Sequence, residues 1–218
     1  MTTDEKLSLL YDYADMPLTS EHFLVPQCLA SDRSRAVKGW VARLLVNFQT
    51  EASKRILIKL AQDKDTLVRT EAYDSLCIFA DDNTEQFLKT AIEQEPSALA
   101  HSYAILSWTD VKVALSNVSK GDISSLEAQC KRERRAPLCR LNCYCGLCRF
   151  GDYAMLEPIL SFLKHKNYRM RCAAIHALDG LMGNGTREAI MAAISQQLPL
   201  ETTVAVKSTI ETFLSDHH

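Results

Sequence analysis

The stretch DTLVRTEAYDSL, residues 65–76, decides the fold of this chain. Its apolar residues Val68, Ala72 and Leu76 are spaced by four, the interval that aligns side chains along one face of an α-helix. Asp65 precedes this stripe, and aspartate is favoured at a helix N-cap because its carboxylate accepts a free backbone N–H. The segment therefore predicts a capped helix with one buried face.

The same pattern recurs along the chain at intervals of about 31 residues, except for one interval that is about ten residues longer. The copies carry apolar or small residues at the three stripe positions: Val37, Val41 and Leu45; Ala98, Ser102 and Leu106; Cys139, Cys143 and Leu147; Met170, Ala174 and Leu178. Three of the four copies begin with a capping residue: Ser34, Ser97 and Asn167. Second amphipathic helices are predicted between the copies, at about 51–62, 83–94, 109–133, 152–164 and 186–196.

This repeating helix pair resembles the HEAT-repeat family, and in particular its compact bacterial form. The resemblance rests on Asp65, Val68, Arg69, Ala72 and Leu76 and on their echoes Asn167, Met170, Arg171, Ala174 and Leu178. It implies an all-α, right-handed α-solenoid of about five to six helix pairs. It also implies that the acidic and the basic residue of each repeat form ladders between neighbouring repeats.

We expect two regions in the chain. Residues 1–30, in which Pro17 and Pro26 mark breaks, predict atypical capping helices. Residues 31–218 predict the repeat array, with an insertion at 109–133 that is broken at Gly121.

The composition is that of an ordinary folded protein, with 47% hydrophobic residues, 24% charged residues and a net charge of -2. A chain without a positive excess has no general attraction for nucleic acid, so a nucleic-acid partner is not expected. No apolar run approaches the ~18 residues of a membrane span, and the N-terminus lacks the apolar segment of a signal peptide. We therefore expect a cytoplasmic, monomeric protein with reduced cysteines and no membrane partner.

The residues opposite the buried stripe predict the surface left for binding. In HEAT-like arrays the corresponding helix face lines a concave groove, which the resemblance implies to be the site of a protein partner. Tyr73, Tyr103 and Tyr144 share one offset there, and tyrosine is favoured at interfaces because it is large, stiff and polar at one end. The alternative is that these rings pack between helices. The predicted groove residues are Arg43, Tyr73, Asp74, Tyr103, Tyr144, His176 and Asp179.

Four of the eight cysteines lie within ten residues: Cys139, Cys143, Cys145 and Cys148. Thiolates at this density suggest a zinc or iron–sulfur site, but the helical positions separate the four, with the first two on the buried stripe. A remaining metal-ligand set consists of groove-facing residues: Cys145, Cys148, Cys172 and His176. The competing interpretation, that these cysteines are small buried apolar residues, is the one we favour, so we expect no metal and no cofactor.

No phosphate loop, zinc-protease motif or nucleophile elbow occurs in the sequence. We therefore predict a non-enzymatic protein-binding scaffold or adaptor that uses the solenoid groove, such as a bacterial immunity or regulatory protein. The alternative function is a DNA glycosylase for alkylated bases, because one family of these enzymes is built from HEAT-like repeats. Trp108 and Asp110 would suit it, but the predicted groove carries almost no Lys or Arg.

Overall fold

The computed structural model describes residues 1–14, 16, 19–132, 136–183 and 185–217. Within these ranges the regular structure consists of helices, with no β-strand. The chain divides into two compact units, Met1–Asn117 and Val118–His218. Each unit is described separately below.

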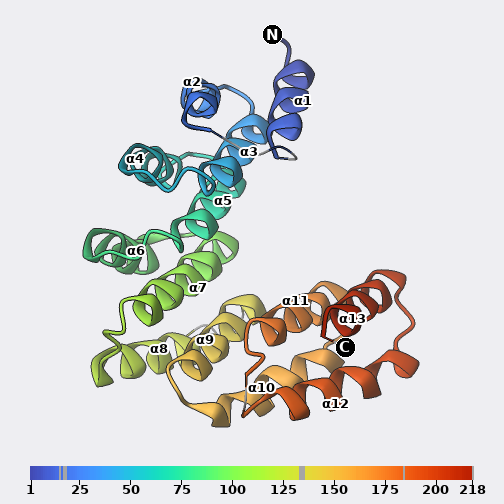
Figure 1. Ribbon diagram of the computed structural model, residues 1–218. Helices are drawn as coiled ribbons and strands as arrows, with labels where there is room; N and C mark the ends of the chain where they lie inside the picture. Colours follow the sequence, from blue (N-terminus) through green and yellow to red (C-terminus); the bar gives the residue numbers. More distant parts are fainter. Residues whose placement is uncertain (15, 17–18, 133–135, 184, 218) are drawn as a thin grey trace. The chain divides into compact units, whose positions relative to one another are not determined.

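The first unit is a stack of helix pairs. Figure 1 shows α2, α4 and α6 following one another along one side of α3, α5 and α7, and α5 packs between α3 and α7. The helices are α1 (Thr3–Ala14), α2 (Leu24–Leu29), α3 (Arg35–Leu45), α4 (Glu51–Leu60), α5 (Thr66–Leu76), α6 (Asp82–Gln94) and α7 (Ala98–Ala114), with a 3-10 turn at Ser20–Phe23.

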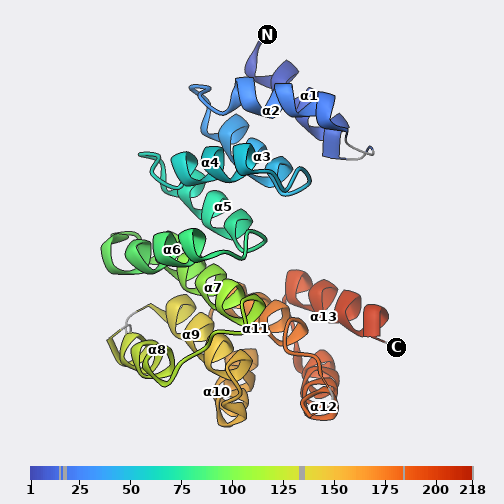
Figure 2. The same ribbon diagram turned by 60° about the vertical axis from the view of Figure 1, so that its left-hand side comes forward.

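The second unit repeats this arrangement. In Figure 2, α9, α11 and α13 follow one another, and α11 packs against both of the others. The helices are α8 (Lys120–Arg132), α9 (Pro137–Arg149), α10 (Leu156–Ser161), α11 (Tyr168–Asp179), α12 (Arg187–Gln197) and α13 (Val204–His217). Short 3-10 turns occur at Tyr153–Met155, Phe162–Lys164 and Leu198–Leu200.

The predicted stripe forms the core of both units. Val68, Ala72 and Leu76 of α5 are fully buried, as are their counterparts Ala174 and Leu178 of α11. Three of the four predicted N-caps form cap bonds, since the side chains of Ser34, Asp65 and Asn167 accept backbone N–H groups of their helices. The all-α solenoid of HEAT-like helix pairs is therefore confirmed.

The helix expected at 109–133 is wrong. Helix α7 instead runs on to Ala114, and a separate helix α8 begins at Lys120. The break lies before Gly121, because Ser119 and Asp122 form reciprocal hydrogen bonds, each accepting the backbone N–H of the other. This capping arrangement starts α8 after a left-handed residue, Ser116, with a φ of 52°.

Charged side chains join successive repeats. A basic residue in one repeat pairs with an acidic residue just before the first helix of the next, and this acid also accepts the backbone N–H two residues further on. We call these four pairs the inter-repeat ladder: Lys6–Asp32 (2.5 Å), Lys38–Asp63, Arg69–Glu95 (2.7 Å) and Arg171–Glu201 (2.7 Å).

The ladder differs from the one that the resemblance implied. Asp65 caps its own helix through the Leu67 N–H and lies 3.9 Å from Arg35, whereas Arg69 pairs with Glu95. The sequence separation between arginine and glutamate differs, at 26 residues for Arg69 and Glu95 and 30 for Arg171 and Glu201. The repeat pattern therefore identified Arg69 and Arg171 but did not pair them with these glutamates.

One prediction concerns the caps. Asp65→Ala should lower the free energy of unfolding by about 1 kcal/mol, because the carboxylate satisfies the Leu67 N–H at 2.9 Å. Ser97 occupies the equivalent position of α7 without a side-chain cap bond, so Ser97→Ala should cost less than about 0.5 kcal/mol. Urea denaturation of the two variants checks this, and equal losses would contradict it.

Candidate functional site

In the first unit the predicted groove residues Arg43, Asp74 and Tyr103 remain accessible to solvent. Arg43 of α3 forms two hydrogen bonds of 2.6 Å with Glu71 of α5 and lies over the Trp40 ring at 5.2 Å. The guanidinium is therefore already held by a carboxylate and an aromatic ring. The hollow of about 210 Å³ beside it is lined by Arg35, Ala36, Gly39, Trp40, Arg43, Leu67 and Glu71.

Tyr73 does not belong to a groove, and this prediction is corrected. The ring is 4% exposed, and its hydroxyl donates to Glu95 at 3.3 Å. Burial first, and then the negative charge of Glu95, raise the pKa of Tyr73. An inner helix of a solenoid has neighbours on several sides, so the face opposite the main stripe is also covered. The interhelical alternative was therefore right for this ring.

Asp74 of α5 and Tyr103 of α7 lie close enough for the charge of Asp74 to act on the Tyr103 hydroxyl. Partial loss of solvation, and then the negative charge of nearby Glu71, raise the pKa of Asp74. Burial and the charge of Asp74 likewise raise the pKa of Tyr103. Because carboxylates and a neutral phenol lie together, this surface disfavours anions such as phosphate.

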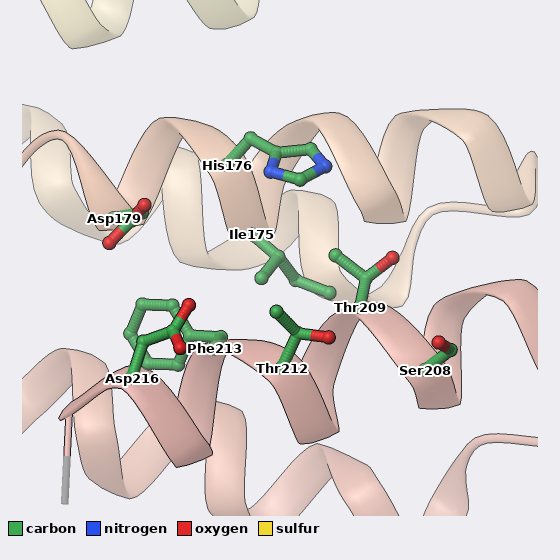
Figure 3. A pocket seen from close by; sticks show the side chains of 8 residues that line it. All are labelled: Ile175, His176, Asp179, Ser208, Thr209, Thr212, Phe213 and Asp216. Carbon is green, nitrogen blue, oxygen red and sulfur yellow. The ribbon is translucent and has the colours of Figure 1, made fainter. Parts of the chain in front are cut away.

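In the second unit, a cleft of about 260 Å³ opens between α11 and α13. Two of the predicted groove residues, His176 and Asp179, line it from α11. Figure 3 shows both side chains on α11, on the side where Ile175 points toward Thr209 and Thr212 of α13. The cleft is lined by Ile175, His176, Asp179, Ser208, Thr209, Thr212, Phe213 and Asp216.

The rim of this cleft is acidic and hydroxyl-rich, and its floor is apolar. Asp179 and Asp216 are exposed carboxylates, whereas Ile175 and Phe213 are 1% and 4% exposed. The Asp179 carboxylate contacts Nε2 of His217 at 2.6 Å, a contact that is an ion pair only when the imidazole is protonated. The rim of the cleft therefore carries oxygen atoms that accept hydrogen bonds, and its floor consists of the apolar side chains of Ile175 and Phe213.

The sequence-based interpretation missed the residues of α13. Ser208, Thr212 and Asp216 are spaced by four, so they form one polar stripe on that helix. This spacing was visible in the sequence, but no copy of the repeat pattern had been found beyond Leu178. Only the packing of α13 against α11 shows that the stripe faces His176 and Asp179.

Tyr144 lies in this unit but outside the cleft. It is half-buried on α9, with its ring 6.5 Å from that of Phe162. The structure therefore groups His176 and Asp179 in one cleft and leaves Tyr144 elsewhere.

The candidate metal ligands are not brought together. Cys145 and Cys148 are buried among apolar side chains, and burial raises the pKa of Cys148 to about 11. Cys172 accepts a hydrogen bond from Thr209 at 3.7 Å, and His176 faces the cleft. No group of three or more His, Cys, Asp or Glu residues within the described ranges is arranged to hold a metal ion.

Comparisons with known proteins also find helical repeats in this chain. A family model described as HEAT repeats matches residues 24–107. Residues 24–107 therefore contain HEAT repeats, as the resemblance drawn from the sequence implied. A search of curated proteins gives no match.

A solved structure with the same fold is human deoxyhypusine hydroxylase in complex with glycerol. It aligns with 100% of this chain and 92% of its own, with a TM-score of 0.51 and 14% sequence identity. At this identity the likeness is one of fold. None of the helices that the structure describes has both the length and the apolar character needed to cross a bilayer.

This comparison overturns the function predicted from the sequence. The prediction of a non-enzymatic protein-binding scaffold treated a motif-free HEAT-like array as evidence against an enzyme. A helical array that aligns with the whole of this chain is a hydroxylase, so the fold gives no ground for excluding catalysis. The alternative, a DNA glycosylase, finds no support in the comparison either.

Proposed function

We propose that the second unit binds a ligand that carries an alkylammonium group, in the cleft between α11 and α13. The observation that carries this proposal is the pair of exposed carboxylates, Asp179 and Asp216, on the two helices that line the cleft. An ammonium group donates up to three hydrogen bonds, and carboxylates and hydroxyls are the acceptors that it requires.

The rest of the cleft fits the alkyl part of such a ligand. Ile175 and Phe213 form an apolar floor, and the hydroxyls of Ser208 and Thr212 lie on the same rim as Asp216. The volume of about 260 Å³ lies below the usual range for drug-sized ligands, which suits a small amine or a single lysine side chain. A small amine and a lysine side chain both present an alkylammonium group, and the experiment below distinguishes them.

Titration calorimetry with three probes tests the proposal at low ionic strength: 1,5-diaminopentane, an acetylated lysine peptide, and the same peptide with norleucine in place of lysine. Norleucine keeps the hydrocarbon and removes the charge, so it should bind at least about fivefold more weakly, the equivalent of ~1 kcal/mol for an exposed ion pair. Binding of the diamine alone identifies a small ligand, and binding of the lysine peptide identifies a protein segment. Equal binding of the norleucine peptide would contradict the proposal.

Charge-removing variants locate the site. Asp216→Asn should weaken binding of the amine about fivefold, because it removes an exposed charge without changing shape. Glu211→Gln is the matched control, since Glu211 is exposed on the same helix and does not line the cleft. If both variants weaken binding equally, the effect is one of net charge, and the cleft is not the site.

A further inference from the structure

The inter-repeat ladder is interrupted at one position in the second unit. Arg140 occupies the place on α9 that Arg69 occupies on α5 and Arg171 on α11. The position of the acidic partner is occupied by His165, two residues before the N-cap Asn167. Its Nδ1 accepts the Asn167 backbone N–H at 3.1 Å, just as the acids of the ladder accept a backbone N–H two residues further on. Where every other pair has a carboxylate, this one has an imidazole.

Arg140 is consequently left without its usual partner. Among the residues that the structure describes, its buried Nε has no hydrogen-bond partner, and its guanidinium lies over the Phe162 ring at 6.0 Å. The positive charge of a half-buried guanidinium stabilises an anion that forms nearby.

The group that this cation influences is the thiol of Cys130, near the end of α8. Cys130 is partly exposed, and its side chain is hydrogen-bonded to Cys143 and to Tyr144 on the facing helix α9. Cys143 is fully buried, so α8 and α9 hold one accessible and one protected sulfur together.

The hydrogen bond from Cys143, together with that from Tyr144 and the charge of Arg140, outweighs burial and lowers the pKa of Cys130 to about 7, from an ordinary value of 9.0. The contrast within the same unit is Cys148, where burial raises the pKa to about 11. Thiol reactivity follows the thiolate fraction and exposure, so Cys130 combines both requirements, whereas Cys148 has neither.

We propose that Cys130 and Cys143 form an oxidation-sensitive dithiol site, in which Cys130 reacts with a hydroperoxide and Cys143 closes a disulfide between α8 and α9. The site stands on the hydrogen-bonded contact of the two cysteines and on the arginine that the interrupted ladder leaves beside them.

The chemistry balances in two steps. The Cys130 thiolate attacks one oxygen of the hydroperoxide, so that a sulfur–oxygen bond forms, the oxygen–oxygen bond breaks, and the alkoxide leaves and takes up a proton as an alcohol. The Cys143 sulfur then attacks the resulting sulfenic acid, the sulfur–oxygen bond breaks, and hydroxide leaves as water with the proton of the second thiol. Two thiols are oxidised to one disulfide, and one hydroperoxide is reduced.

Peptide mapping of the oxidised full-length protein tests the proposal without any variant. The reduced protein is treated with one equivalent of hydrogen peroxide at pH 7, blocked with an alkylating agent and digested with trypsin and chymotrypsin. Cleavage after Lys131 and after Tyr144 separates Cys130, Cys143 and the pair Cys145 and Cys148 into different peptides.

The expected product is one cross-linked species that joins the Cys130 and Cys143 peptides, with a mass two hydrogen atoms below their sum. Recovery of both cysteines as alkylated thiols, or a disulfide that joins any other pair, would overturn the proposal.

Two variants resolve the steps. In Cys143→Ser the sulfenic acid on Cys130 should accumulate and be trapped by dimedone, because the second thiol is missing. Arg140→Met should slow alkylation of Cys130 at pH 7 about threefold and move the pH profile upward, whereas Arg169→Met, which removes an exposed arginine, should change neither. Dimedone on another cysteine, or equal effects of the two arginine variants, would count against the site.

Discussion

Arg171→Met should lower the free energy of unfolding by about 3 kcal/mol, because it leaves a buried carboxylate without its cation. The Glu201 side chain is 2% exposed, and both of its oxygens accept hydrogen bonds from Arg171, at 2.7 and 2.9 Å. These bonds outweigh burial and, with those from Thr202 and Thr203, lower the pKa of Glu201 to about 2. Urea denaturation at pH 7 measures the loss.

Arg169→Met is the matched control for this prediction. Arg169 lies on the same turn of α11 and is exposed; its side chain lies over the neighbouring Tyr168 ring at 5.9 Å and its Nε donates to the Tyr168 hydroxyl at 3.4 Å. Its replacement should cost less than about 0.5 kcal/mol. The double variant Arg171→Met/Glu201→Gln should recover much of the loss, because it removes the unpaired charge as well. A double variant no more stable than Arg171→Met would show that packing, and not charge, is responsible.

The same pair sets a pH dependence. Because the pKa of Glu201 is lower in the folded chain than its ordinary value of 4.5, the folded state binds fewer protons, and the contribution to stability is fully present above about pH 4.5. It is lost as the pH falls from about 4.5 towards 2. Between pH 6 and pH 3, the difference in unfolding free energy between the wild type and Arg171→Met should therefore narrow. A constant difference over this range would contradict the assignment.

Leu76→Ala should destabilise the first unit by about 3 kcal/mol, within the ~2–5 kcal/mol range for buried leucines. Leu76 is fully buried on α5, which packs against α3, α4 and α7, so neighbours on several sides prevent the cavity from collapsing. Leu67 of the same helix is 47% exposed, and Leu67→Ala should cost less than about 0.5 kcal/mol. Urea midpoints and slopes measure both variants.

Hydrogen exchange adds a local measure of the same prediction. In a repeat array each helix pair contacts only its neighbours, so protection should fall first in α3, α5 and α7. A Leu76→Ala variant with unchanged protection in these three helices would contradict the packing described here.

The sequence was sufficient to predict features that depend on residues close together in the chain, such as a helix and its cap. The spacing of Val68, Ala72 and Leu76 and the cap Asp65 predicted a helix and its buried face, and both depend on residues within one or two turns. The start of helix α8 was not predicted, because it depends on the reciprocal bonds of Ser119 and Asp122 and not on the conformational freedom of Gly121.

The candidate sites required contacts between helices. The helical positions of His176 and Asp179 predicted an exposed face. The residues of α13 line the same cleft only because α13 packs against α11: Ser208, Thr212 and Asp216. The metal-ligand sets suggested by the sequence did not include Cys130, which meets Cys143 only because α8 packs against α9.

What the sequence by itself determined is the helical repeat, since a period of about 31 residues and a four-residue apolar spacing are properties of the chain alone. What only the tertiary structure decided is which polar groups meet. Glu95 forms an ion pair with Arg69, and Glu201 forms one with Arg171. At the equivalent position His165 does not bond the Nε of Arg140. The physical reason is that a hydrogen bond or ion pair depends on distances of a few ångströms between helices, which residue spacing along one helix does not encode.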